Sequence, residues 1–293
     1  MKLLSDLKSA KVIHPPEFLP DNTHYMVVTG SVAYGVSQDM SDMDLAGFCV
    51  PPKDIIFPHT AGIIQGFGPE GRKFESWQQH HISYNEKIYD FAVYSIIHYF
   101  QLALDNNPNM VDTLYVADNL VLHCTALGRH VRANRKLFLH KGAYHKFMGY
   151  AYSQLKKATS KEPIGKRRKI VEKYGFDVKF ASHLIRLADE AEQILSTGEL
   201  DLTRSKGVQK DIRAGRYTLE QVEAMFREKV PHIERLYAAE NSPIPHQPNT
   251  EAVKELLFQC LEMQYGSLDK LIVREDSTQR LVSEIESVLA KYR

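Results

Sequence analysis

The feature that most constrains the fold is a strand, a tight turn and a second strand within residues 25–50. The apolar run 25–28, "YMVV", predicts a strand that ends at the turn of Gly30 and Ser31. The segment 43–50, "MDLAGFCV", predicts a second strand closed by two prolines, and the small residues between the strands favour the start of a helix. The N-terminal part is therefore predicted to contain a β-sheet.

A third strand and a long series of helices follow. Alternation in residues 87–95, "KIYDFAVYS", predicts the third strand, whereas the polar and Gly-rich residues 51–86 are interpreted as an insertion with irregular strands. Thr218 and Gln221 have the spacing of a capping box. Helical segments are predicted at 2–12, 95–107, 108–118, 141–158, 166–197, 218–239, 248–265 and 277–292. The expected fold class is α+β, with a small sheet domain over residues 1–120 and an all-helical domain over residues 121–293.

Composition and charge are those of an ordinary globular protein. The 293 residues are 43% hydrophobic, and 37 Lys and Arg against 36 Asp and Glu leave a formal net charge of +1. Bulk charge therefore indicates neither a nucleic-acid nor a membrane partner. The three cysteines are far apart and lack a C-x-x-C pair, which is typical of reduced thiols. Charges interrupt the N-terminal segment, and no apolar run approaches the ~20 residues needed to span a bilayer, so we expect a soluble cytoplasmic protein.

Three aspartates are candidates for a metal site. Side chains alternate along a strand, so Asp42 and Asp44 emerge on one face, and their mutual repulsion favours a cation between them. Asp90 in the third strand is the candidate third ligand. Mg²⁺ is usually bound by one or two carboxylates together with substrate phosphates. Two such ions can stabilise both the attacking and the leaving oxygen of a phosphoryl transfer.

The turn of Gly30 and Ser31 fits the same hypothesis. Glycine lets the backbone approach a phosphate closely, and the serine hydroxyl and the N–H groups of a following helix are donors for anionic oxygens. Each feature alone has a commoner structural explanation: a simple turn, a surface loop, or a solvated strand residue. Their order along the chain is what favours a metal-dependent site for a triphosphate.

The segment 29–48, "TGSVAYGVSQDMSDMDLAGF", resembles the signature G-S-x-A-Y-G followed by S-D-x-D-x-x-G of the DNA polymerase β-like nucleotidyltransferase superfamily. It is most similar to the predicted nucleotidyltransferases of bacteria and large phages, some of which are encoded beside RNA ligases. Residues 89–115 resemble the third-aspartate strand and the helix after it. Residues 177–187, "DVKFASHLIRL", resemble the K-x-x-x-H-x-x-R helix of the same group.

This resemblance implies a mixed-sheet nucleotidyltransferase domain with an appended helical domain. It also implies a nucleoside triphosphate and two Mg²⁺ ions, with Mn²⁺ as an alternative. Asp90 would bind a metal or the attacking hydroxyl. The roles carried over are phosphate binding by Gly30 and Ser31, metal binding and catalysis by Asp42, Asp44 and Asp90, and nucleotide binding by Lys179, His183 and Arg186.

The helix predicted over residues 177–195 carries a polar stripe that admits two interpretations. Lys179, His183, Arg186 and Glu190 share one narrow face, opposite an apolar one. The stripe is either a solvated face or the wall of a cleft in which Lys179 and Arg186 contact nucleotide phosphates.

Two further segments are ambiguous. The basic run 156–169, "KKATSKEPIGKRRK", is either a solvated loop or a grip on a polynucleotide backbone. His80 and His81 in "WQQHH" lack a second ligand pair at a zinc-like spacing, so we interpret them as structural or solvated. The sequence contains no G-x-x-x-x-G-K-[ST] motif, which argues against a P-loop NTPase.

The leading hypothesis is a Mg²⁺-dependent nucleotidyltransferase that moves a nucleoside monophosphate from a nucleoside triphosphate to a hydroxyl acceptor and releases pyrophosphate. An RNA end, a protein hydroxyl and a small aminoglycoside-like molecule are all compatible acceptors. One alternative is a catalytically inactive nucleotide- or RNA-binding regulator or antitoxin-like protein. Another is a phosphohydrolase that uses the same carboxylates.

Overall fold

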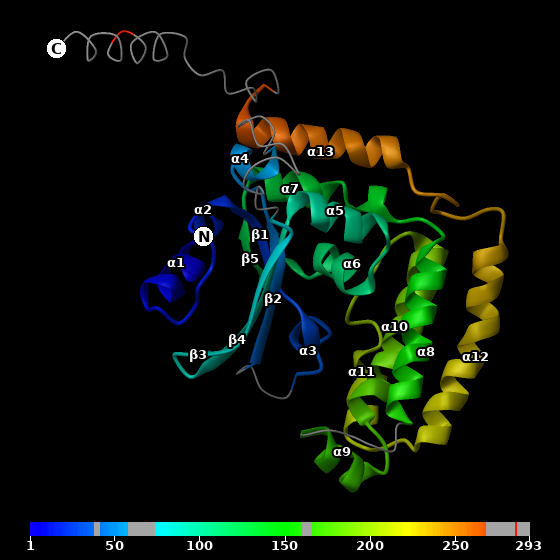
Figure 1. Ribbon diagram of the computed structural model, residues 1–293. Coiled ribbons are helices and arrows are strands. Elements are labelled where there is room, and N and C mark those ends of the chain that lie inside the picture. The colour runs from blue at the N-terminus through cyan, green and yellow to red at the C-terminus, as the bar shows by residue number, and fades with distance from the viewer. Residues whose placement is uncertain (38–41, 58–73, 160–165, 268–284, 286–293) are drawn as a thin grey trace.

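The computed structural model describes residues 1–37, 42–57, 74–159, 166–267 and 285. One mixed sheet occupies the N-terminal part (Figure 1), with strands β1 (Thr23–Val28), β2 (Asp42–Cys49), β3 (Ser76–Tyr84), β4 (Lys87–Ser95) and β5 (Val121–Cys124). The strand order is β3-β4-β2-β1-β5. β2 and β4 are parallel, and the other neighbouring pairs are antiparallel.

Helices precede, connect and follow the strands. Those of the first half are α1 (Lys2–Ser9), α2 (Leu19–Asn22), α3 (Gly30–Ala33), α4 (Lys53–Ile56), α5 (Ile96–Leu104), α6 (Pro108–Tyr115) and α7 (Ala126–Ala133). Those of the second half are α8 (Ala143–Ala158), α9 (Lys166–Tyr174), α10 (Val178–Thr197), α11 (Lys206–Arg213), α12 (Leu219–Ala238) and α13 (Thr250–Tyr265). The predicted α+β class, a mixed sheet followed by helices, is confirmed.

Alternation along the strands gives the sheet two apolar faces. On one face Met26, Leu45 and Phe91 pack with residues of α1 in a small core. On the other face Tyr25 and Phe48 belong to a larger core that continues through α5 and α6 into the later helices. Because side chains alternate, the odd-numbered and even-numbered residues of β2 and β4 face different cores.

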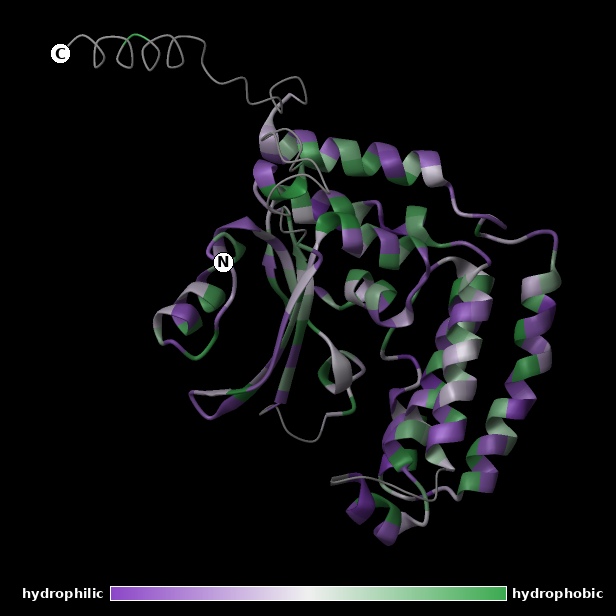
Figure 2. Ribbon diagram, viewed as in Figure 1, coloured by the Kyte–Doolittle hydropathy of each residue, from purple (hydrophilic) through white to green (hydrophobic). Residues whose placement is uncertain are grey.

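α10 is the central helix of the second half. It packs against α8, α11 and α12, and its apolar residues are buried except Phe180, which is partly buried (Figure 1). Hydrophilic and hydrophobic residues alternate along α8 and α12, as expected for helices with one solvated face (Figure 2). The predicted capping box at the start of α12 is confirmed, since Thr218 and Gln221 each bond the other's backbone N–H.

Two predictions about elements need correction. The helix predicted over 166–197 is two helices, because the chain turns at Gly175 (φ +82°) and Asp177 caps the second one. Strand β5 lies just beyond the predicted boundary at residue 120 and pairs with β1. The insertion 51–86 contains the nine-residue strand β3, whose pairing is irregular between Gln79 and Ile82 as predicted, and the short helix α4. Residues 58–73 of this insertion lie outside the described residues, as does the helix predicted at 277–292 apart from residue 285.

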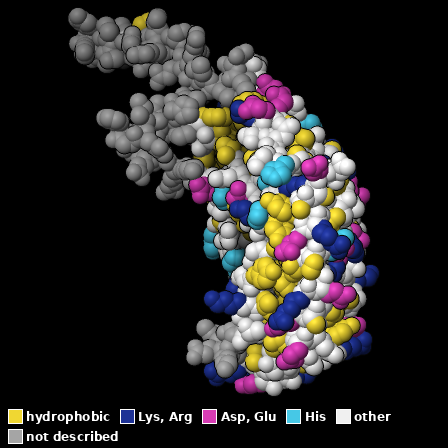
Figure 3. All heavy atoms as spheres, turned by 90° about the vertical axis from the view of Figure 1, so that its right-hand side faces the viewer, with side chains coloured by type: hydrophobic (Ala, Val, Ile, Leu, Met, Phe, Trp, Pro, Cys, Tyr) yellow, Lys and Arg dark blue, Asp and Glu magenta, His cyan; other side chains and the backbone are white. Residues whose placement is uncertain are grey.

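Surface charge is mixed. On the face shown in Figure 3, basic and acidic side chains are intermingled with hydrophobic ones. None of the described helices combines the length and the apolar character that crossing a bilayer requires.

Candidate active site

The parallel pairing of β2 with β4 brings the three predicted aspartates to one face of the sheet. Asp44 lies directly opposite Asp90 in the register, and Asp42 lies opposite Ile88. Leu45 and Phe91, one position further along each strand, are buried on the other face. The carboxylates therefore point toward the side of the sheet that carries α3 and α10.

The turn after β1 lies against these carboxylates. Thr29 donates a backbone hydrogen bond of 2.8 Å to the carbonyl oxygen of Asp44, which fixes the turn to β2. Gly30 adopts φ +63°, and a Cβ placed there would lie 2.0 Å from Oδ2 of Asp44. Only glycine fits at this position, because both the backbone conformation and the space exclude a side chain.

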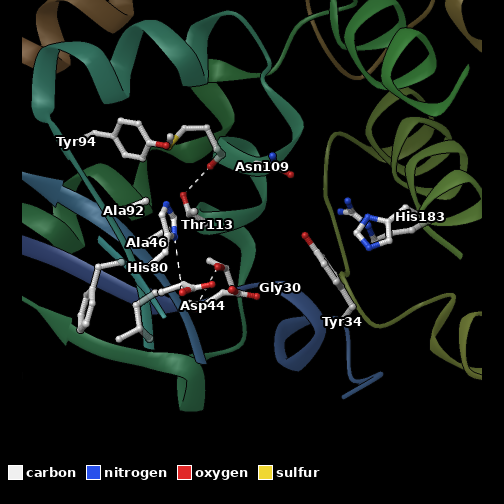
Figure 4. Close-up of a pocket in the computed structure, with 16 residues that line it drawn as sticks. Gly30, Tyr34, Asp44, Ala46, His80, Ala92, Tyr94, Asn109, Thr113 and His183 are labelled. Atoms are coloured by element: carbon white, nitrogen blue, oxygen red, sulfur yellow. Dashed lines mark hydrogen bonds and ion pairs between the residues drawn. The ribbon is translucent and has the colours of Figure 1, made fainter. Parts of the chain in front are cut away.

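A cavity of about 300 Å³ opens beside the turn, between the sheet and α10. Asp44, Gly30 and His80 lie on its sheet side, His183 lies on the α10 side, and Tyr34 lies between them (Figure 4).

A second cavity, of about 410 Å³, adjoins the first. Gly30 and Asp44 line the first cavity, and their near neighbours Ser31 and Asp42 line the second. Val36 and Ser37 also line the second cavity, and the rest of its wall comes from the helical half of the chain and includes Tyr174, Lys179 and Arg213. The two cavities therefore lie next to each other on the face that carries the carboxylates, and we refer to them together as the cleft.

His80 is a site residue that the sequence interpretation missed. The register of β3 shifts between Gln79 and Ile82, and His81 adopts φ +56° there. The backbone N–H of His81 donates a 2.6 Å hydrogen bond to Oδ1 of Asp90, and Nδ1 of His80 lies 3.7 Å from the same oxygen. Both histidine side chains are exposed, as expected, but His80 also lines the first cavity. No sequence signal marks a register shift of this kind, because it is defined by pairing with β4.

Arg186 lies in a buried ion-pair network at the wall of the first cavity. Its Nη1 donates to Asp112 Oδ2 at 2.7 Å and to Glu190 Oε1 at 2.9 Å. Its guanidinium stacks 4.0 Å from the ring centre of Tyr34, whose hydroxyl donates to Asp112 Oδ2 at 2.6 Å. Arg186 and Glu190 are each 1% exposed, so the interpretation of the stripe as a solvated face is wrong for them. The sequence did not predict Asp112 as a site residue, since nothing near Asp112 in the sequence indicates that it pairs with Arg186.

Most residues that line the cleft lie in a segment that matches a known protein family. Residues 5–202 match the family described as RNA repair pathway DNA polymerase beta family. The chain belongs to this family. No curated protein matches it. A solved structure, a nucleotidyltransferase-like protein from Exiguobacterium sibiricum, is 10% identical over 98% of this chain and 90% of its own, with a TM-score of 0.29.

The family match contains every site residue predicted from the sequence, from Gly30 to Arg186. It places the chain among polymerase β-like nucleotidyltransferases associated with RNA repair. The match ends before α11, so Arg213, which completes the wall of the second cavity, lies outside it.

Helix α10, which lies within the family match, contributes two further predicted residues to the cleft. Lys179 is exposed and lines the second cavity, and His183 lines the first. Burial, followed by the nearby charges of Arg186 and Arg213, lowers the pKa of His183 to about 3. His183 is therefore neutral at physiological pH and can offer the cleft only a neutral imidazole.

The carboxylates fit a divalent cation whose shell the substrate completes. Partial burial, followed by the charges of Asp90 and Asp42, raises the pKa of Asp44, so the site disfavours uncompensated negative charge. Within the described residues, no three His, Cys, Asp or Glu side chains converge as a preformed metal centre. Mg²⁺ commonly takes one or two carboxylates and fills its other positions with water and phosphate oxygens. This donor set suits such an ion.

Proposed function

We propose that the chain is a Mg²⁺-dependent nucleotidyltransferase that moves a nucleoside monophosphate from a nucleoside triphosphate to the hydroxyl of an RNA end. The observation that carries the proposal is the register pairing of Asp44 with Asp90 beside the glycine turn. An RNA end is favoured over the other acceptors because the family is described by its place in an RNA repair pathway.

The donor half of the site lies around α3 in this proposal. Asp42 and Asp44 hold the metal ions, with Asp90 as the third carboxylate. The turn of Gly30 and Ser31 receives the phosphates, since the missing side chain at Gly30 lets a phosphate oxygen approach the backbone. Two bound Mg²⁺ ions would neutralise the charge on the transferring phosphoryl group and on the leaving pyrophosphate.

The acceptor half is the first cavity. A hydroxyl entering it lies beside Asp90, which orients the hydroxyl and accepts its proton. The hydroxyl oxygen forms a bond to the α-phosphorus, the bond from that phosphorus to the bridging oxygen breaks, and pyrophosphate leaves with the electron pair. Positioning and charge neutralisation supply most of the rate.

The helix residues take different roles. Lys179 is exposed in the second cavity, where its ammonium can contact phosphate. Arg186 already donates to two carboxylates and is almost fully buried, so we assign it a positioning role instead of the phosphate contact expected from the sequence. It holds Tyr34, and through Tyr34 the segment that follows the glycine turn.

The test is incubation with each α-labelled ribonucleoside triphosphate, Mg²⁺ and single-stranded RNA, comparing the wild type with Asp44→Asn. We expect Asp44→Asn to reduce labelling of RNA at least 100-fold, because it removes a metal ligand. Its folding should be retained, since replacing one of two facing carboxylates relieves repulsion. Chelation of Mg²⁺ should abolish labelling by the wild type.

A matched control is Asp118→Asn. Asp118 is an exposed acid paired with Arg132, remote from the cleft lining, and its variant should label RNA at the wild-type rate. Wild-type labelling by Asp44→Asn contradicts the mechanism. Nucleotide binding without turnover would favour an inactive regulator, and release of nucleoside monophosphate without labelled RNA would favour a phosphohydrolase.

A further inference from the structure

Arg213 is the last residue of α11 and lies in the wall of the second cavity. It faces the same space as Ser31, Asp42 and Lys179. Neither the family match, which ends at residue 202, nor any sequence motif assigns it a role.

The charge of Arg213 has no counter-ion in the described part of the chain. Its Nε donates to the Ser182 hydroxyl at 3.3 Å and its Nη1 to the Val36 carbonyl at 3.5 Å. No carboxylate among the described residues lies within ion-pair distance of it, whereas its neighbour Arg186 has two. Burial, followed by the charge of Arg186, lowers the pKa of Arg213, as expected for a guanidinium without a compensating anion.

The rest of the cavity wall suits an anion with several oxygens. Lys179 is a second cation without an ion pair to any described residue, and it is exposed. Ser31 of α3 lines the same space. Tyr174 is part of the same wall, and Gly215 (φ +74°) packs so closely against it that a Cβ there would be 2.3 Å from the tyrosine ring. Arginine binds phosphate oxygens through two parallel N–H groups, and a lysine adds a point charge.

We propose that Arg213 and Lys179 bind the β- and γ-phosphates of the nucleoside triphosphate in the second cavity. The proposal rests on the proposed function for the identity of the donor. It assigns α11, outside the family match, to the donor site, so that the sheet supplies the carboxylates and the helical half supplies the cations. After transfer, the helical half therefore holds the leaving pyrophosphate.

The test is equilibrium binding of inorganic tripolyphosphate, and separately of ATP, GTP, CTP and UTP, each with Mg²⁺. Arg213→Ala should weaken binding of tripolyphosphate and of the preferred triphosphate at least tenfold. Binding of the corresponding nucleoside monophosphate should change less than twofold, because it lacks the β- and γ-phosphates. The affinity of Arg213→Lys for tripolyphosphate should lie between those of the wild type and Arg213→Ala, since lysine keeps the charge and loses the paired N–H donors. If Arg213→Ala proves unfolded by circular dichroism, Arg213→Lys carries the test, with a several-fold loss expected.

The matched control is Arg216→Ala, which removes an exposed arginine three residues further on that pairs with Asp211. It should bind every probe as the wild type does. Wild-type affinity of Arg213→Ala for tripolyphosphate overturns the proposal, as does an equal loss of affinity for the monophosphate. Labelled transfer by the wild type, measured in parallel, separates the two proposals. If the wild type transfers label and Arg213→Ala binds tripolyphosphate as the wild type does, only the proposal for Arg213 fails. If Arg213→Ala loses tripolyphosphate binding and the wild type transfers no label, only the proposed nucleotidyltransferase activity fails.

Discussion

Gly30 and Asp44 share a space that leaves no room for a side chain between them. The left-handed backbone at Gly30 and the 2.0 Å approach of its virtual Cβ to Oδ2 of Asp44 are independent constraints on the same position. A methyl group there must displace the carboxylate or the turn. Either movement separates the phosphate-binding turn from the aspartates.

We therefore expect Gly30→Ala to lower the free energy of unfolding by roughly 1–3 kcal/mol, through backbone strain and the clash. Its transfer activity should fall to background. Urea denaturation and RNA labelling measure the two effects.

The control for Gly30→Ala is Gly149→Ala, in the exposed face of α8, where a Cβ meets nothing within 4 Å. That change should be neutral or stabilise by up to about 1 kcal/mol, because alanine is the better helix former. Equal behaviour of the two variants would show that the close approach at Gly30 is no constraint.

Local periodicity was sufficient to align Asp42 with Asp44 but not to place the arginine. Asp42 and Asp44 share a face because strand side chains alternate, a rule that needs only the local sequence, whereas Asp90 joins them through the pairing of β2 with β4. Arg186 is buried because Asp112 meets it from a position 74 residues earlier. Nothing in the helical period of α10 distinguishes a charged stripe that faces water from one that faces such a partner.

At the scale of elements, the break between α9 and α10 sets the position of Lys179. Gly175 ends the first helix in the left-handed conformation, and the Asp177 side chain accepts the backbone N–H groups of Lys179 and Phe180. Both residues are typical helix-boundary signals, so the sequence contained the break, although the helical period continues across it. β5 gave no such signal, because its four residues are a strand only through pairing with β1.

Asp177→Ala should destabilise the protein by roughly 1–2 kcal/mol, the usual value for a lost N-cap. It should also reduce transfer, since the first turn of α10 carries Lys179. Asp177→Asn should restore the cap and with it most of the transfer, because asparagine caps equally well, while the ion pair of Asp177 with Arg167 stays lost. Chemical denaturation and labelling rates provide the measurements.

Thr218→Ala provides the comparison at another helix. It breaks the capping box of α12, a helix that lines neither cavity, and should cost about 1 kcal/mol with no loss of transfer once the protein is folded. A parallel loss of activity in Thr218→Ala would mean that stability alone, and not the position of α10, limits transfer.

At the scale of the whole molecule, the Arg186 network joins the sheet half to the helical half. Tyr34 follows α3, Asp112 belongs to α6, and Arg186 and Glu190 belong to α10. Burial raises the pKa of Glu190 well above its usual range, with the charge of Arg186 acting in the opposite direction. The arginine thus compensates the negative charge of carboxyl groups that are buried away from water.

Arg186→Met should cost about 3–5 kcal/mol, because it leaves these buried carboxyl groups without their cation. Adding Glu190→Gln should recover part of the loss, and a double-mutant cycle in urea measures the coupling. Arg204→Met, which removes a more exposed arginine paired with Asp189 and Glu192, should cost less than about 1 kcal/mol. Similar losses for the two arginine variants would contradict a structural role for the buried network.

The in-register pairing of Asp44 with Asp90 also bears on how the chain folds. Parallel strands require a long crossover, so β4 docks on β2 only after a large loop has closed, and this is a slow kind of step. Each docking event also brings two negative charges together before any cation compensates them. At 0.1 M salt, ions in solution screen such repulsion beyond about 10 Å, and at lower salt the repulsion acts over a longer distance. The residues that make the cleft attractive to cations therefore make assembly of the sheet sensitive to ionic strength.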